Sequence, residues 1–206
     1  MTLAVNSRLA HEVEWSASYT RSRAEDTASD FDEQPQHPNA LSAERAPSRY
    51  DEPNRFVASG LFELPIGDEE DLKPGAQLPA WARALSHIEL APIIIIASGH
   101  PGNPLTGQDD LRTHAFPLSR RPPGFARNSL RTPSTVTVDL RVLKFLNIPP
   151  HGKLDFVVEA FNLSNRTNIV GLNPFFGPPS GPNPRFGKPL DAAAARQIEF
   201  SVDYEF

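Results

Sequence analysis

The chain has 206 residues, a formal net charge of −5 and no cysteine. This length is sufficient for one folded domain, the acidic balance argues against a nucleic-acid binder, and the lack of cysteine excludes disulfides and thiolate metal sites. Its 22 prolines gather between proline-poor windows. Because proline cannot donate to a β-ladder, the windows predict strands and the proline clusters predict loops.

Seven windows alternate apolar and polar residues, the pattern of a strand with two different faces. Val136, Val138, Leu140 and Val142, for example, are separated by polar or charged residues. We expect strands at 2–9, 12–23, 54–64, 86–98, 134–146, 153–163 and 196–206. If each strand pairs with its sequence neighbour, they form one antiparallel meander.

Two segments fit this pattern less well. The window 86–98 is apolar almost throughout and contains Pro92, so it is the least regular of the seven. No segment shows a sustained helical period, and "DAAAARQ" (191–197) is expected to form at most one helical turn before the last strand.

The connections between the strands alternate in length. Those at 9–11, 65–84 and 146–152 are short or intermediate, whereas those at 24–53, 99–133 and 163–195 are long. All three long connections then lie at one end of the meander, an asymmetry typical of outer-membrane barrels with long outer loops. Strands of about nine to eleven residues also suit a tilted crossing of a bilayer. The sequence therefore favours a transmembrane β-barrel segment, and a soluble or secreted β-sandwich that binds a ligand remains the alternative.

The last strand continues to the end of the chain. Its apolar positions are Ile198, Phe200, Val202, Tyr204 and Phe206. Outer-membrane barrels generally finish on a strand with a terminal aromatic residue, which the barrel-assembly machinery reads. We therefore predict that Phe200, Val202, Tyr204 and Phe206 form an assembly signal, with the two terminal aromatic rings at the periplasmic interface.

Five stretches in this order resemble the C-terminal barrel of TonB-dependent outer-membrane receptors of the Oar-like group. They are "SASYTRSRAEDTASDF", "AERAPSRYDEPNRFVASGLFELPIG", "RNSLRTPSTVTVDLRV", "VVEAFNLSNRTNI" and "RFGKPLDAAAARQIEFSVDYEF". The resemblance covers most of the chain and is weakest at 66–98. It implies uptake of a ligand through a 22-stranded barrel closed by an N-terminal plug and energised by TonB.

The same resemblance sets the expected extent and partners of the chain. Residues 1–206 would be a partial barrel domain without the signal peptide, the plug and the N-terminal strands. The chain would lie in the cell outer membrane, contact its lipid and the barrel-assembly machinery, and meet TonB only through missing N-terminal regions. The ligand and the residues that bind it are unknown.

Other chemistry is sparse. The six histidines lack metal-ligand spacing, and no catalytic motif occurs, so we expect neither an enzyme nor a cofactor or metal site. The acidic run "DTASDFDE", with Asp26, Asp30, Asp32 and Glu33, is interpreted as a solvated loop, and "GDEED" (67–71) as a wet periplasmic turn. Asn162 and Asn165 are expected to form hydrogen bonds at a turn and a strand end.

Overall fold

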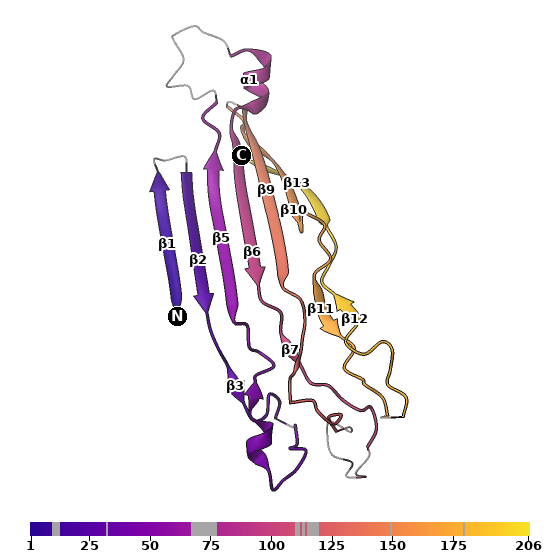
Figure 1. The fold of residues 1–206 in the computed structure, drawn as a ribbon. Coiled ribbons are helices and arrows are strands. Elements are labelled where there is room, and N and C mark those ends of the chain that lie inside the picture. The colour runs from indigo at the N-terminus through magenta and orange to yellow at the C-terminus, as the bar shows by residue number, and fades with distance from the viewer. Residues whose placement is uncertain are drawn as a thin grey trace.

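The computed structural model describes residues 1–9, 13–31, 33–66, 78–109, 112, 114, 120–148, 150–178 and 180–206. Its main feature is a seven-stranded antiparallel sheet with the order β1-β2-β5-β6-β9-β10-β13 (Figure 1). The strands are β1 (Thr2–Leu9), β2 (Val13–Arg21), β5 (Asn54–Glu63), β6 (Ile88–Ala97), β9 (Thr135–Ile148), β10 (Gly152–Phe161) and β13 (Gln197–Glu205). Each strand pairs with its neighbour in the predicted series, so the predicted meander is confirmed.

The three long connections all lie at one end of the sheet, which we name the loop end; the opposite end is the turn end (Figure 1). Each long connection contains a two-stranded hairpin at the loop end. These hairpins are β3 (Glu25–Asp26) with β4 (Ala46–Pro47), β7 (Pro101–Gly102) with β8 (Leu130–Arg131), and β11 (Ile169–Leu172) with β12 (Pro189–Ala192). A short 3-10 helix, η1 (Leu41–Glu44), precedes β4.

The sequence prediction of the segments outside the seven strands was partly wrong. A short helix, α1 (Ala80–Leu85), forms at the turn end between β5 and β6, where no helix was expected. The segment "DAAAARQ", expected to form at most one helical turn, forms none: Asp191 and Ala192 belong to β12, and Ala193 donates its amide to the carbonyl of Asn168 (2.8 Å). The predicted turn at 67–71 lies outside the described residues. Among the described helices, none is long and apolar enough to cross a membrane.

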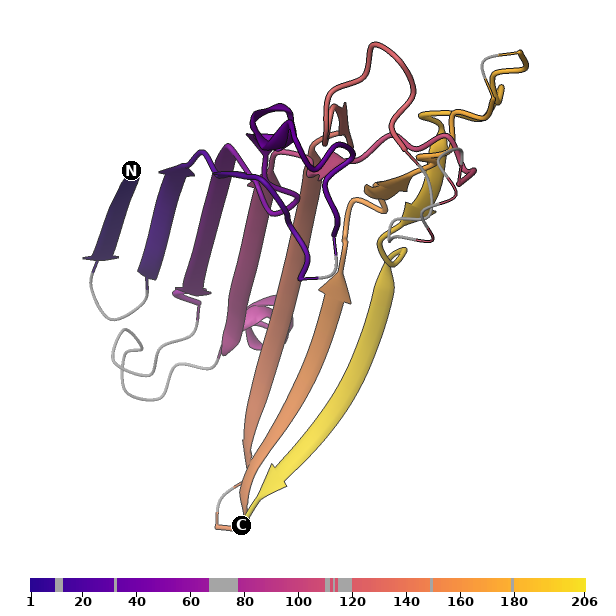
Figure 2. The same cartoon turned by 90° about the horizontal axis from the view of Figure 1, so that it is seen from below.

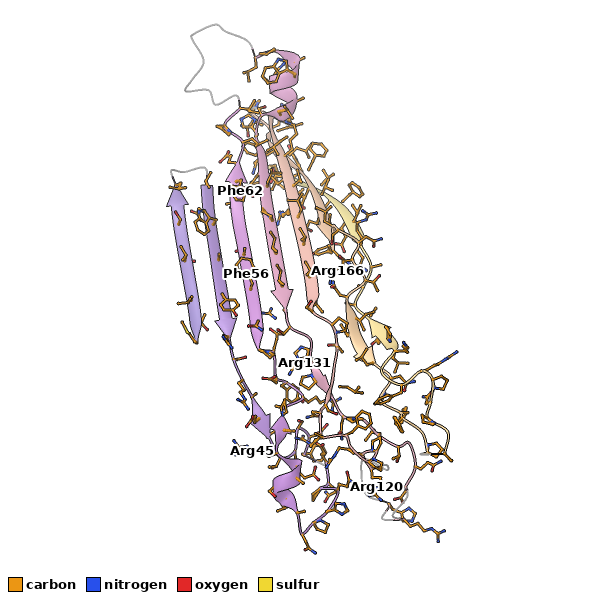
Figure 3. All side chains as sticks on the ribbon, in the orientation of Figure 1. Arg45, Phe56, Phe62, Arg120, Arg131 and Arg166 are labelled. Carbon is orange, nitrogen blue, oxygen red and sulfur yellow. The ribbon has the colours of Figure 1, made fainter. Side chains whose placement is uncertain are left out.

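The register separates the sheet into two faces. Leu9, Val13, Phe62, Leu90, Val142, Val158 and Phe200 lie side by side in one row across all seven strands. Val5, Ala17, Ala58, Ile94 and Val138 form a second row on this side, which we name the apolar face. Figure 3 shows Phe56 and Phe62 of this face on β5. Apolar side chains here remain open, with Leu9 61% and Phe200 77% exposed.

The opposite side is the polar face. Across β9, β10 and β13 it presents Arg141, Glu159 and Glu199 in one row, and Asp155 lies opposite Asp203. Farther along the sheet, the hydroxyls of Ser16 and Ser59 form a hydrogen bond of 2.9 Å between β2 and β5. The alternation in the sequence therefore sorts polar and apolar side chains onto different sides, as predicted.

The sheet is curved and open. Figure 2 shows β1 and β13 at its two opposite edges, and within the described residues each of these strands pairs with one neighbour only. The described part of the chain contains no second large sheet that packs on the apolar face. The two-layer sandwich, which was the alternative, does not form among these residues.

Candidate functional site

The predicted signal residues within the C-terminal strand lie on one face of the sheet. Phe200, Val202 and Tyr204 lie on the apolar face of β13, opposite Val158, Phe156 and Leu154 of β10. The Tyr204 hydroxyl donates to the carbonyl of His151 in the turn between β9 and β10. The Tyr204 ring stacks on Phe206, with 5.9 Å between ring centroids. These contacts order the end of the chain, and its role as an assembly signal stays a prediction.

A second cluster joins the first two long connections at the loop end. Arg127, whose side chain has no exposed surface, donates from Nε and Nη2 to the two carboxylate oxygens of Glu33, each at 2.8 Å. Its Nη1 donates to Asp26 Oδ1 at 2.7 Å, and its Nη2 also donates to the Ser29 hydroxyl at 2.8 Å. Because the guanidinium is a planar fork of donors, it can satisfy several acceptors of one loop at once.

Two further arginines of the second connection make equivalent pairs. Arg121 donates to both carboxylate oxygens of Glu44 at 2.7 and 2.9 Å, and both side chains are nearly buried. Arg131 donates from Nη2 to Asp51 at 2.7 Å and from Nη1 to the carbonyl of Gly99 at 2.7 Å. We name these three contacts, Arg121–Glu44, Arg127–Asp26/Glu33 and Arg131–Asp51, the loop clasp. Figure 3 places Arg131 where the loops leave the sheet.

The clasp keeps its carboxylates ionised. Burial raises the pKa of Glu33, but the hydrogen bonds and charge of Arg127 outweigh this effect and leave that pKa below its ordinary value. The pKa values of Asp26, Glu44 and Asp51 are lowered in the same way, with hydrogen bonds and arginine charges overcoming burial. Hydrogen bonds to Glu33 in turn raise the pKa of Arg127. The four carboxylates of the clasp are therefore charged at neutral pH.

The interpretation of "DTASDFDE" as a solvated loop was wrong for two of its carboxylates. Asp26 and Glu33 hold Arg127, whereas Asp30 pairs loosely with Arg49 at 3.7 Å and Asp32 lies outside the described residues. The sequence signal was the complementary charge of "RRPPGFARNSLR" (120–131), in the next long connection. Reading each loop by itself missed this pairing.

A cavity of about 550 Å³ opens beside the clasp. All three long connections line it: Tyr50 from the first, His100 from the second, and Val170 from the third. Leu105, Leu130, Leu172 and Pro174 add an apolar wall, and Asp30 and Arg49 add charge. Cavities of a few hundred cubic ångströms that combine apolar walls with a few polar groups are typical small-molecule sites. The sequence alone did not identify any of these lining residues as a site.

The predicted roles of the two asparagines are confirmed. Asn162 donates its side-chain amide to the carbonyls of Arg166 (3.0 Å) and Ala194 (3.2 Å), and its backbone amide donates to Asp139 Oδ1 (2.8 Å). Asn165 accepts from the amide of Arg196 at 3.1 Å. Both residues have positive φ, 49° and 52°, which asparagine tolerates at turns. They fix the point where the third long connection leaves and re-enters the sheet.

The part of the chain that the structure describes contains no candidate metal-binding site. No group of three or more metal-ligating side chains gathers among these residues. The loop cavity and the end of β13 are two places where the described surface offers a candidate site.

The sequence was compared with known proteins. The sequence model of a family described as "Outer membrane beta barrel domain" matches residues 1–124, which is more than half of the chain. This match includes β1, β2, β5 and β6 and much of the loop end. No match was found among curated proteins or among solved structures.

Proposed function

This chain belongs to the family of outer membrane β-barrel domains, and we propose that it is the C-terminal barrel wall of a TonB-dependent, Oar-like receptor that takes up a ligand. The chain lies in the outer membrane. Its apolar face meets lipid, and its polar face lines the inside of the barrel, because lipid-exposed and lumen-exposed side chains alternate in such strands.

The observation that carries this proposal is the shared position of the three long connections. They lie at one end of a single meander and together line a cavity of about 550 Å³. In barrels of the outer membrane the long loops face the cell exterior, so the loop end faces outward and the turn end faces the periplasm. The loop clasp fixes the first and second connections against each other before a ligand arrives, which limits the entropy lost on binding.

The ligand class follows only in outline from the cavity. Its apolar wall, together with Tyr50, Arg49 and His100, suits a small molecule that combines an apolar or ring-shaped part with polar groups. The resemblance to the Oar-like group supplies the transport step and the dependence on TonB. The open edge of β1 can pair with a further strand of a complete barrel.

The proposal is tested with an epitope inserted at Gly181 in the chromosomal gene of the native host. Added atoms have space at this glycine, because apart from its chain neighbours no atom lies within 4 Å of a Cβ at this position. We expect the epitope to be accessible on intact cells, and we expect a heat-modifiable outer-membrane band larger than 22.7 kDa that crosslinks to TonB.

A matched epitope at Leu78, in the connection between β5 and β6 at the turn end, should be accessible only after the outer membrane is opened. A 22.7 kDa band in the soluble fraction would contradict membrane insertion. A protein whose epitope is accessible on intact cells but that never crosslinks to TonB would support the barrel and contradict the assignment as a TonB-dependent receptor.

A further inference from the structure

Helix α1 presents its large apolar side chains outward. Trp81 is 64% exposed and Leu85 is 43% exposed, whereas the small residues Ala82 and Ser86 are 3% and 6% exposed. Trp81 and Leu85 are four residues apart, so they lie on one side of the helix. A helix that packs on a water-soluble protein would bury the tryptophan and expose the serine. Helix α1 therefore directs its largest apolar side chains away from the described part of the protein.

The apolar face reaches α1 through Lys144. Among the described strand positions of this face, the charged residues are Arg21 at the loop end and Lys144 at the turn end. Lys144 Nζ donates to the carbonyl of Arg83 in the last turn of α1 (3.2 Å) and to the carbonyl of Ser86, the residue after the helix (2.7 Å). The helix thus adjoins the turn-end border of the lipid-facing surface and holds the one cation there.

Chain direction explains how the helix comes to this place. Lys144 lies opposite Ile88, the first residue of β6, and Ser86 precedes Ile88 by two residues. The backbone between them turns at His87, whose φ is +54°. The hydrogen bonds from Lys144 to the carbonyls of Ser86 and Arg83 then hold the end of α1 beside the apolar face. Figure 1 shows α1 at this end, above the start of β6.

We propose that α1 is an interfacial anchor that lies among the phospholipid headgroups of the periplasmic leaflet, with Trp81 and Leu85 directed into the membrane border. The proposal rests on the lipid-facing orientation given above for the apolar face. Tryptophan favours the headgroup level because its ring is apolar and its N–H is polar. Lys144 extends its charge to the same level along an apolar stem, and the exposed Arg83 faces phosphate groups.

The occupant is lipid and not a protein partner because the surface is continuous with the lipid-facing rows. Trp15 of β2 lies, through Gly60 of β5, at the same level of the sheet as Leu140 of β9. Lys144 lies four residues farther along β9 than Leu140, about 13 Å nearer the turn end at a typical rise per residue. Between these levels the apolar face carries Val142 and no charge. The aromatic pair Tyr204 and Phe206 reaches the same end of the sheet, so α1 extends an aromatic border that the last strand begins.

The experiment uses spin labels on the full receptor, purified from outer membranes and reconstituted in vesicles of phosphatidylethanolamine and phosphatidylglycerol. Single cysteines replace Trp81, Leu85, Val138 or Gly181, and this segment offers no competing thiol. Accessibility to lipid-soluble oxygen and to a water-soluble nickel chelate then gives the depth of each label. We expect Val138 deepest, Gly181 in water, and both Trp81 and Leu85 between them at headgroup depth.

Each outcome decides the inference. If the labels at Trp81 and Leu85 are as accessible to the nickel chelate as the label at Gly181, α1 lies in water and the anchor is overturned. A label at Val138 that is deep in the membrane in the same experiment still supports the barrel. Labels at Trp81 and Leu85 that are protected from both reagents show a protein partner and also overturn it. A Val138 label that oxygen does not reach removes the membrane orientation itself, and the proposed function fails with the anchor.

Discussion

Arg127 and Glu33, 94 residues apart in the chain, form a two-pronged ion pair with both N–O distances at 2.8 Å. The arginine belongs to the second long connection and the glutamate to the first. Both connections leave the same end of the sheet, so the pair converts two separate loops into one unit. Charge pairs therefore join the first and second connections, whereas Phe125 of the second connection packs against Phe176 and Phe186 of the third.

The first prediction concerns Arg127→Met. The substitution leaves Asp26 and Glu33 without their cation, and loss of one partner of a buried pair typically costs about 3–5 kcal/mol. We expect a value toward the lower end, because these carboxylates are 25% and 14% exposed and water can reach them. Backbone hydrogen exchange in residues 22–53 should accelerate. Arg49→Met, which breaks an exposed pair at 3.7 Å, is the matched control and should change exchange little.

The second prediction concerns pH. The carboxylates of the clasp have lowered pKa values, against ordinary values of 3.8 for Asp26 and 4.5 for Glu33. The stability that they contribute is therefore complete above about pH 4.5 and is lost as the pH falls through the lowered values of the folded state. We expect the three long connections to become sensitive to protease only below about pH 4.5. Equal protease resistance at neutral pH and near pH 2 would contradict the assigned role of the clasp.

The strands could be predicted from sequence because a sheet between two environments imposes a strict period of two. Each of the seven predicted strands is present, and the ends differ by a few residues; β9, for example, continues to Ile148. The irregular window around Pro92 is also explained. The pairing of β5 with β6 is interrupted at Pro92, because proline has no amide to donate. The paired residues on the two sides of this gap are Ser59 with Ile93 and Phe62 with Leu90.

The remainder could not be predicted from local patterns. Helix α1 has six residues, too few to show a helical period, and a contact from Lys144, 58 residues beyond Ser86, fixes its end. The segment around Ala193 has high helix propensity but forms no helix, and the Ala193 amide donates to the carbonyl of Asn168 instead. The clasp and the cavity depend on contacts between loops, which no single window of sequence contains.

The third prediction tests which face meets lipid. Val138 lies in the apolar row with Ala58 and Ile94, and its neighbour Thr137 points to the polar face. Val138→Arg should reduce the heat-modifiable, assembled form, because a cation on the lipid face near the bilayer centre costs about 2–4 kcal/mol. Thr137→Arg is the matched control and should assemble normally. The reverse order of the two variants would place the polar face against lipid.

The fourth prediction concerns the end of β13. Phe206→Ala removes the terminal ring that stacks on Tyr204, and we expect less receptor in the outer membrane and more degradation product in the periplasm. Glu205→Ala, one residue earlier and on the polar face opposite Lys153, is the control. Quantitative immunoblots of the two fractions give the comparison. Equal assembly of both variants would show that Phe206 is no part of an assembly signal.

The fifth prediction is that residues 1–206 expressed alone do not form a working channel. β1 and β13 each have one paired neighbour in the described sheet, so each leaves a free row of backbone groups. In lipid each unsatisfied group costs several kcal/mol, and in water the exposed edges and the "APIIIIA" run favour association. We expect aggregates or edge-to-edge oligomers in sedimentation and no heat-modifiable monomer on gels.

Coexpression with the strands that close the barrel should restore the monomer. A soluble, monodisperse chain of 22.7 kDa that melts cooperatively would instead show a self-sufficient domain, whose apolar face must then be covered by contacts other than lipid.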